Sequence, residues 1–111
     1  MLHATLQIVM SNFIKLTTQS ELPAVNEVKE FPCGERTICV ANVNGTISAM
    51  DNVCLHLGGP LGQGTVDDGK VVCPWHGWSF DASTGAAAHN PNAKVAVYSV
   101  KIENGDVMIE L

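Results

Sequence analysis

Charged residues are scarce in this chain, and basic ones are the scarcer kind. Only 15% of the 111 residues are Asp, Glu, Lys or Arg, against about a quarter in ordinary globular domains. Six Lys and Arg stand against eleven Asp and Glu, which leaves a formal net charge of −5. So few basic residues do not provide the positively charged surface that binds a nucleic-acid phosphate backbone or an anionic membrane. The composition therefore predicts no nucleic-acid partner and no membrane partner.

Long apolar runs are also missing, since no stretch approaches the roughly 20 residues that a membrane-spanning helix needs. The opening stretch Met1 to Met10 is broken by His3, Thr5 and Gln7. It has neither the basic start nor the small-residue cleavage site of a signal peptide. We therefore expect a cytoplasmic protein. In that compartment four cysteines favour metal or redox chemistry over disulfides, because cytosolic thiols are kept reduced.

The hydrophobic content of 46% suits a compact fold, and a chain of this length can bury roughly two-thirds of its unfolded surface in one core. The hydrophobic content and the chain length therefore predict that residues 1–111 form a single domain. Residues 1–11 form an N-terminal extension to it, and the sequence does not indicate the role of this extension.

Short strand-like runs separated by turn signals make up most of the chain, as is typical of an all-β domain. Asn44-Gly45 and Asn104-Gly105 are strong hairpin signals, because both positions of each pair tolerate positive φ. The expected strands are Phe13–Thr17, Glu27–Phe31, Arg36–Val43, Thr46–Asp51, Val95–Glu103 and Asp106–Leu111.

No amphipathic helix is expected. The segment Gln19–Ala24 predicts one helical turn with Ser20 as its N-cap. Pro23 and the short length of the segment prevent a longer helix.

The region from about residue 52 to residue 93 differs in composition from the rest of the chain, since it holds seven of the ten glycines among short apolar segments. A loop-rich insert of this length is usually functional, or it needs an internal staple because it has too little regular structure to hold itself.

Two mixed pairs of metal-ligating residues lie inside this insert. Cys54-Leu55-His56 is followed, after sixteen residues, by Cys73-Pro74-Trp75-His76. At the Cys and His frequencies of this chain, the pattern has a chance of about 10⁻⁴ of arising by coincidence. The four residues are therefore the candidate site.

The two pairs resemble the signature of the Rieske iron–sulfur family, which is Cys-x-His, a spacer of about sixteen residues, then Cys-x-x-His. The likeness extends to the whole of Cys54–Pro60 and Cys73–Asp81, and with the flanking strands it runs from about Asn12 to Leu111. The resemblance implies an all-β Rieske iron–sulfur domain: an antiparallel β-sandwich with a loop-rich, cluster-binding insert.

The resemblance also implies one [2Fe–2S] cluster, in which two Cys hold one iron and two His hold the other. Cys54 and Cys73 would bind the first iron, and His56 and His76 the second. Neutral imidazoles in place of thiolates remove two negative charges, so such a cluster is reduced more easily than an all-Cys one. Glycines beside the ligands let backbone N–H groups approach the sulfurs.

Two other interpretations of the four residues stay open. A Cys₂His₂ set suits tetrahedral zinc, although zinc modules usually pair two Cys in one knuckle. A thiol catalyst built from Cys73 and His76 would need a third, orienting group that nothing in the sequence suggests.

The remaining candidates have plainer interpretations. Cys33 and Cys39 lie on or beside the early strands, away from the insert, and we expect them to be small buried hydrophobes. By resemblance, His89 falls in a third, Pro-containing loop near the histidine edge of the cluster. Solvated turn caps are the default interpretation of three carboxylates: Asp67, Asp68 and Asp81.

Departures from the subtypes of the family narrow the expected role. Gly59 and Trp75 stand where respiratory-complex Rieske proteins carry a disulfide, and Trp78 and Phe80 stand where those proteins place Ser and Tyr hydroxyls. The catalytic subunits of Rieske oxygenases add a large mononuclear-iron domain that has no counterpart here, and they usually carry Arg at the position of Leu57. The resemblance is therefore to small soluble Rieske ferredoxins.

The expected function is one-electron transfer from a reductase to a terminal oxygenase, with no bond chemistry by the chain itself. The resemblance implies a flavoprotein as the reductase. One alternative is the small Rieske-type subunit of a nitrite reductase. A second, from another class, is a non-redox binding module with structural zinc. The sequence does not identify the reductase, the acceptor or the substrate, because these are properties of the partner proteins.

Overall fold

The structure is a computed structural model, and it describes residues 12–75 and 77–111. The N-terminal extension and His76 lie outside the described residues. In the described part, strands and two short 3₁₀ turns are the regular elements, and no helix there is long and apolar enough to cross a membrane.

The larger sheet has six strands in the order β1-β11-β10-β4-β3-β2, all antiparallel. Both predicted hairpins are confirmed: β3 and β4 turn at Asn44-Gly45, and β10 and β11 turn at Asn104-Gly105, with positive φ at all four residues. The strands of this sheet are β1 (Phe13–Thr18), β2 (Glu27–Cys33), β3 (Arg36–Val43), β4 (Thr46–Asp51), β10 (Val97–Glu103) and β11 (Asp106–Glu110).

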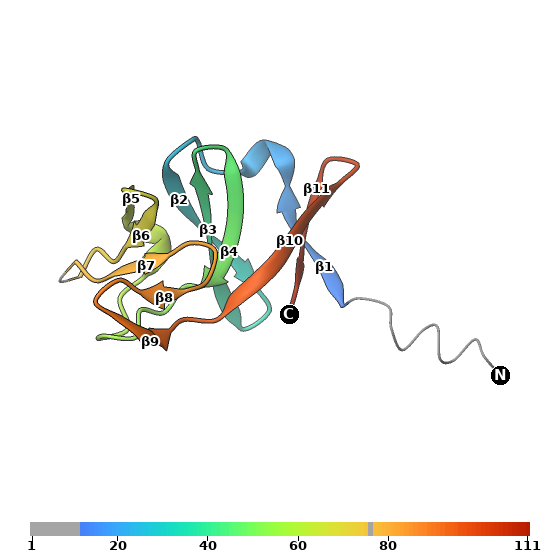
Figure 1. Cartoon of the computed structure of the whole chain (residues 1–111). Coiled ribbons are helices and arrows are strands. Elements are labelled where there is room, and N and C mark those ends of the chain that lie inside the picture. The colour runs from blue at the N-terminus through green and yellow to red at the C-terminus, as the bar shows by residue number, and fades with distance from the viewer. Residues whose placement is uncertain (1–11, 76) are drawn as a thin grey trace.

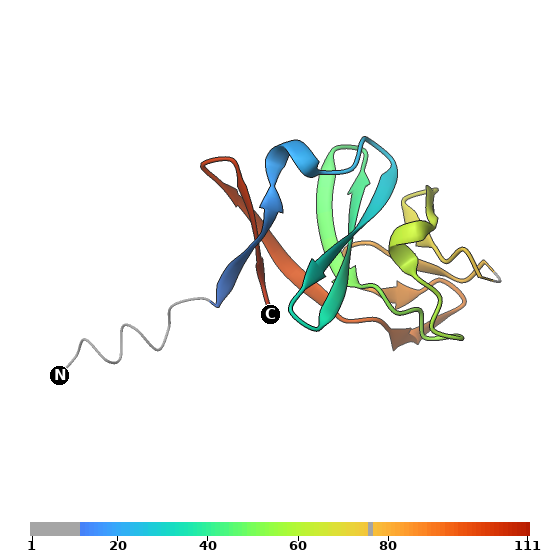
Figure 2. The same ribbon diagram turned by 180° about the vertical axis from the view of Figure 1, so that it is seen from behind.

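The smaller sheet has five strands in the order β5-β6-β7-β8-β9, again antiparallel. It lies at the opposite end of the molecule from β1 and the β10–β11 hairpin (Figure 1), and the view from behind shows the same separation (Figure 2). Its strands are β5 (Thr65–Asp67), β6 (Lys70–Val72), β7 (Ser79–Asp81), β8 (Ala86–Ala87) and β9 (Asn90–Lys94).

This sheet corrects the expectation that the insert has too little regular structure to hold itself. Its strands are two to five residues long, which is too short for an alternating pattern to be recognised in the sequence. Tight turns join several of them, as at Asp68-Gly69, where both residues have positive φ. The insert is therefore a small sheet with long loops at one end.

The helical turn is confirmed, but its predicted cap is wrong. The 3₁₀ turn η1 spans Gln19–Glu21, so Ser20 lies inside it and Thr18 is the N-cap, without a side-chain cap hydrogen bond. The Ser20 hydroxyl instead pairs with the Thr18 hydroxyl at 3.1 Å. A three-residue turn leaves no room for an N-cap at its second position.

Strand β3 fills two cores, because successive side chains of a strand point to opposite faces. Ile38 and Val40 pack with Phe31, Ala49 and Ile109 inside the larger sheet. Cys39 and Ala41 face the other way, into a core shared with the insert. That second core contains Met50, Cys54, Leu61, Val71, Cys73, Phe80, Ala82, Ala87 and Val95 as well.

Gly85 closes the turn between β7 and β8, and we expect Gly85→Ala to be strongly destabilising. Its φ is +79°, and an added β-carbon would collide with the carbonyl oxygen of Val95. We expect the free energy of unfolding to fall by about 2 kcal/mol or more in urea denaturation. Gly69→Ala is the matched control, because Gly69 also has positive φ (+77°) but open space around it. An equal loss in both variants would show that crowding at Gly85 does not matter.

Candidate metal centre

The first candidate loop leaves β4 and folds back on itself. The Cys54 N–H donates to the Gly59 carbonyl at 2.9 Å, and the Gly58 N–H donates to the Cys54 carbonyl at 2.9 Å. Val53 and Pro60 form an isolated bridge across the base of the loop. Gly58 has a φ of +79°, which only glycine adopts without strain. These contacts fix the backbone around Cys54.

The second candidate loop caps the β6–β7 hairpin. Val72 pairs with Ser79, so Cys73 directly follows the first strand and Trp78 directly precedes the second. The Cys73 N–H donates to the Trp78 carbonyl at 2.7 Å, and the Trp75 N–H donates to the Cys73 sulfur at 3.4 Å. The smaller sheet therefore delivers Cys73 to the same end of the molecule as the first loop.

The two loops bring Cys54 and Cys73 together, each only 2% exposed. Burial raises the pKa of the Cys54 thiol and its hydrogen-bonding neighbour Cys73 raises it further, while the backbone N–H groups of His56 and Leu57 lower it. No disulfide joins the pair, since both cysteines are free. A thiolate at Cys54 is disfavoured by this burial, and a bound iron would supply the compensating positive charge.

Gly59 makes room for this pair. A β-carbon at position 59 would lie 2.6 Å from the Cys73 sulfur and 3.1 Å from the Trp75 indole. Two adjacent buried thiols, backbone N–H groups directed at their sulfurs and a glycine cradle fit the cysteine side of an iron–sulfur cluster. The donor set and its surroundings therefore suit the cofactor that the sequence resemblance implies.

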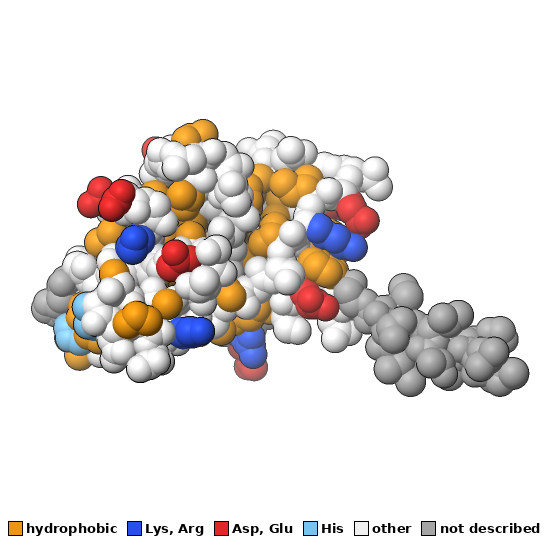
Figure 3. All heavy atoms as spheres, viewed as in Figure 1, with side chains coloured by type: hydrophobic (Ala, Val, Ile, Leu, Met, Phe, Trp, Pro, Cys, Tyr) orange, Lys and Arg blue, Asp and Glu red, His pale blue; other side chains and the backbone are white. Residues whose placement is uncertain are grey.

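His56 stacks on Trp78, with the ring centroids 4.7 Å apart and the planes within 4°. His89 meets the same indole edge-on at 4.1 Å and 74°. His89 therefore lies on the His56 side of the site, in agreement with the expectation for the third loop. Figure 3 shows histidine side chains among apolar ones at the end of the molecule formed by the smaller sheet.

The predicted ligands are brought together only in part. Within residues 12–75 and 77–111, no three His, Cys, Asp or Glu side chains are placed to hold one metal ion together. Cys54 is beside Cys73, His56 is beside Trp78, and His76 lies outside the described residues.

The other two cysteines divide between the two cores. Cys39 is fully buried in the core that also holds Cys54 and Cys73, so the expectation that it lies away from the insert is wrong. The reason is the alternation of β3, which directs Cys39 toward the insert. Burial, with a smaller contribution from Glu30, raises the pKa of Cys39 to about 12. Cys33 is half-buried and packs against the core of the larger sheet, so both thiols pack as small hydrophobes.

Among the three carboxylates, Asp81 is confirmed as a turn cap. Its Oδ1 accepts hydrogen bonds from the Ser83 N–H at 2.8 Å, the Ser83 hydroxyl at 2.6 Å and the Thr84 N–H at 2.9 Å. These bonds lower the pKa of Asp81, the Ser83 hydroxyl contributing most. Asp67 and Asp68 are exposed, and Asp68 turns the chain between β5 and β6 with a φ of +52°.

The lowered pKa of Asp81 predicts a pH-dependent contribution to stability. A carboxylate whose pKa is lower in the folded state stabilises above its unfolded pKa of about 3.9 and loses this effect as pH falls through the folded pKa. We expect Asp81→Asn to cost no more than about 1 kcal/mol at pH 7, because solvent screens this site. The difference from the parent protein should shrink as urea unfolding is repeated at pH values falling from 5 to 2. A difference that stays constant with pH would contradict the assignment.

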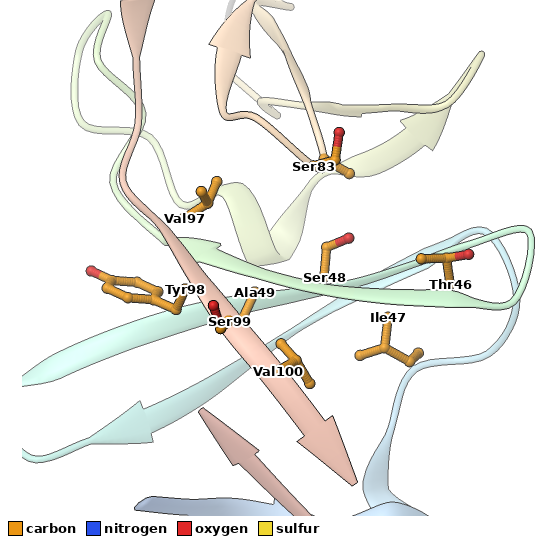
Figure 4. A pocket seen from close by; sticks show the side chains of 10 residues that line it. Thr46, Ile47, Ser48, Ala49, Ser83, Val97, Tyr98, Ser99 and Val100 are labelled. Carbon is orange, nitrogen blue, oxygen red and sulfur yellow. The ribbon is translucent and has the colours of Figure 1, made fainter. Parts of the chain in front are cut away.

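A groove lies elsewhere on the molecule, away from the two candidate loops. It has a volume of about 320 Å³ and runs between β4 and β10 beside the Ser83 turn. Figure 4 shows that Ser48, Ser99 and Val100 contribute to its lining. Its lining is made of hydroxyl and apolar side chains and includes no Cys, His or carboxylate, so it does not belong to the candidate centre.

Sequence reasoning missed two polar residues beneath the first loop. Asn52 is only 6% exposed, and its amide nitrogen donates to the Glu30 carboxylate at 2.7 Å. A Glu in a strand and an Asn in a turn both carry the ordinary signal of exposed residues. Only the position of Asn52, two residues before Cys54, could have drawn attention to it.

Comparison with known proteins identifies the family to which the two Cys-containing loops belong. The family described as "Rieske [2Fe-2S] domain" matches residues 12–100. The ferredoxin component of the naphthalene 1,2-dioxygenase/salicylate 5-hydroxylase systems of a Ralstonia species is 32% identical over 101 residues, which are 90% of this chain and 96% of that protein. The Sphingomonas yanoikuyae B1 ferredoxin structure superposes with a TM-score of 0.79 at 32% identity, covering 90% of this chain and 99% of that one.

The domain also occurs as a small part of larger proteins. Apoptosis-inducing factor 3 of Mus musculus is 34% identical over 84 residues, which are 75% of this chain but only 14% of that protein. Since the family match covers most of the chain, this protein belongs to the Rieske [2Fe–2S] domain family.

Proposed function

We propose that this chain is a soluble one-electron carrier of the cytoplasm, a Rieske ferredoxin that takes electrons from a reductase and passes them to a terminal oxygenase. The observation that carries the proposal is its likeness, over nearly their whole lengths, to ferredoxins. The matched segment is 96% of the dioxygenase-system component from Ralstonia and 99% of the Sphingomonas ferredoxin. A likeness of that extent favours a carrier over a catalytic subunit.

In the proposed centre Cys54 and Cys73 hold one iron and His56 and His76 hold the other. The cluster, when bound, takes up and releases one electron. The chain itself positions the two cysteine sulfurs and buries both thiols. It also directs the backbone N–H groups of His56, Leu57 and Trp75 at these sulfurs. We regard residues 1–111 as one domain that carries the cluster in its insert, residues 52–93.

An uncharged apolar rim is the proposed docking face. Four large hydrophobic side chains of the two loops are exposed: Val53, Leu55, Leu57 and Trp75, which are 48–61% exposed. No Asp, Glu, Lys or Arg occurs in residues 52–66, 71–80 or 82–93. A small apolar rim can lose its water on contact and still release a transient partner. The acidic residues lie outside these runs, where they steer encounter with a basic partner and make the association rate fall with salt.

We expect Leu57→Ala to slow electron transfer to the oxygenase several-fold while leaving the visible spectrum and the midpoint potential nearly unchanged. Leu57 is 61% exposed, so its side chain contributes contact area without supporting the core. Stopped-flow oxidation of the reduced protein by the oxygenase component of a naphthalene 1,2-dioxygenase system measures the effect. Ile102→Ala is the control, because Ile102 is 41% exposed near the end of β10. Equal rates in both variants would place the docking face elsewhere.

The proposed function is tested by metal and sulfide content. Protein purified without oxygen should contain about two irons and two acid-labile sulfides per chain, as a [2Fe–2S] cluster requires, and should show a reduced-state electron paramagnetic resonance signal. One zinc per chain with no sulfide would contradict the proposal and favour a structural zinc module.

A further inference from the structure

A polar clamp closes the base of the first candidate loop. Asn52 is the one polar side chain that is buried among the described residues. Its amide oxygen accepts from the Gly62 N–H at 2.7 Å, and its backbone carbonyl accepts from the Leu61 N–H at 2.8 Å. Asn52 therefore joins the two ends of the loop that contains Cys54.

Glu30, in the middle of β2, anchors this clamp to the larger sheet. Its Oε2 accepts from the Asn52 amide at 2.7 Å and its Oε1 accepts from the Gln63 amide at 3.1 Å. One carboxylate thus bonds the residue where the loop begins and a residue just after it ends. Packing is equally close, because a β-carbon on Gly62 would collide with the Glu30 side chain and lie 2.8 Å from the Asn52 amide oxygen.

The carboxylate is on the face of the sheet that meets the insert. Glu30 pairs directly with Cys39 across β2 and β3, and directly opposed residues present their side chains on the same face. Cys39 packs in the core that contains Cys54 and Cys73. A negative charge on this face lies on the same side as the thiols.

Resting on the proposed function, we propose that Glu30 and Asn52 are positioning residues for the metal centre. They hold the Cys54 loop in its metal-binding shape, and the Glu30 charge sets the midpoint potential lower than the ligands alone would set it. Hydrogen bonds to a charged acceptor are stronger than neutral ones, and loss of Glu30 leaves the amide nitrogen of the buried Asn52 without this acceptor. The electrostatic part follows because reduction adds negative charge beside an existing one.

The potential test compares Glu30→Gln with Glu27→Gln in the full-length, iron-loaded protein. Both changes remove one negative charge from β2, but Glu27 is exposed, and three residues along a strand place it on the opposite face. We expect Glu30→Gln to raise the midpoint so that the ratio of reduced to oxidised protein at a fixed potential grows at least threefold, about 28 mV for one electron. The Glu27 variant should move by less than a third of that. Equal shifts, or no shift with Glu30→Gln, would overturn the electrostatic part.

The positioning test uses hydrogen exchange, read by mass spectrometry on peptides that span residues 52–63. We expect Asn52→Ala and Glu30→Ala to speed exchange in this loop at least fivefold, and Glu27→Ala to leave it unchanged. Exchange in the loop as slow as in the parent protein in both variants would overturn the positioning role. Hydrogen exchange measures how far Glu30 and Asn52 protect the loop, whether the protein carries iron, zinc or no metal. Its outcome is therefore separate from the outcome for the proposed function. If Asn52→Ala does not fold, Glu30→Ala alone decides.

Discussion

Replacing Cys73 with alanine is expected to leave the purified protein without its cluster, with iron and acid-labile sulfide below about a tenth of the parent content. One sulfur of the buried pair is then missing, and the remaining three ligands cannot complete the tetrahedral coordination of both irons. Cys54 would also lose its hydrogen-bonding neighbour. Metal and sulfide analysis, together with the electron paramagnetic resonance signal of the reduced protein, measure the loss.

Cys39→Ala is the matched control for this substitution. Cys39 is a free thiol, fully buried in the same core as Cys73, so its replacement removes a similar volume from the same region. We expect it to lower the free energy of unfolding without lowering the iron content of the folded protein. Retention of two irons by the Cys73 variant, or an equal loss of iron in both, would contradict the proposed ligand set.

The midpoint potential is expected near the bottom of the Rieske range, at about −150 mV rather than +300 mV. Hydrogen bonds to cluster sulfur stabilise the more negative, reduced state, and hydroxyl donors are missing at Trp78 in the second loop and at Phe80 in β7. Trp78 presents an indole ring to His56, and Phe80 is fully buried in the core that contains the two thiols. A clearly positive midpoint in protein-film voltammetry at neutral pH would contradict the expectation.

Restoring a hydroxyl should raise the midpoint. We expect Phe80→Tyr, provided that the new hydroxyl reaches a sulfur, to raise it by about 40 mV, which is one hydrogen bond of about 1 kcal/mol for one electron. Trp78→Ser with Phe80→Tyr should raise it further, although the serine change also removes the ring stacked on His56. Phe31→Tyr is the control, because Phe31 is buried in the other core, and it should leave the midpoint unchanged.

Local signals account for the parts of the fold that the sequence predicted correctly. The Asn-Gly pairs at residues 44 and 104 define both large hairpins, since the backbone conformation they require is a property of the two residues themselves. Strand ends were less predictable. β2 runs on to Cys33 through Pro32, which an edge strand tolerates because a proline without an N–H can face away from its one neighbour.

Contacts between distant residues account for what was missed. The resemblance of the two Cys-containing loops to the Rieske signature implied that Cys54 and Cys73 would meet, because both would bind one iron. Nothing comparable links Glu30 to Asn52, which lie 22 residues apart on different elements. The orientation of Cys39 depended on which face of β3 the insert covers, and that is decided only when the two sheets pack.

The position of β3 between two cores determines which parts of the chain can change in sequence. Ile38 and Val40 fill one core, and Cys39 and Ala41 fill the other, so an altered side-chain volume at any of these four positions is transmitted to a close-packed neighbour. The outer residues of β9, namely Asn90, Pro91, Asn92 and Lys94, are exposed instead. Libraries that diversify the molecule for new partners are therefore best confined to these exposed positions, with β3 left as it is.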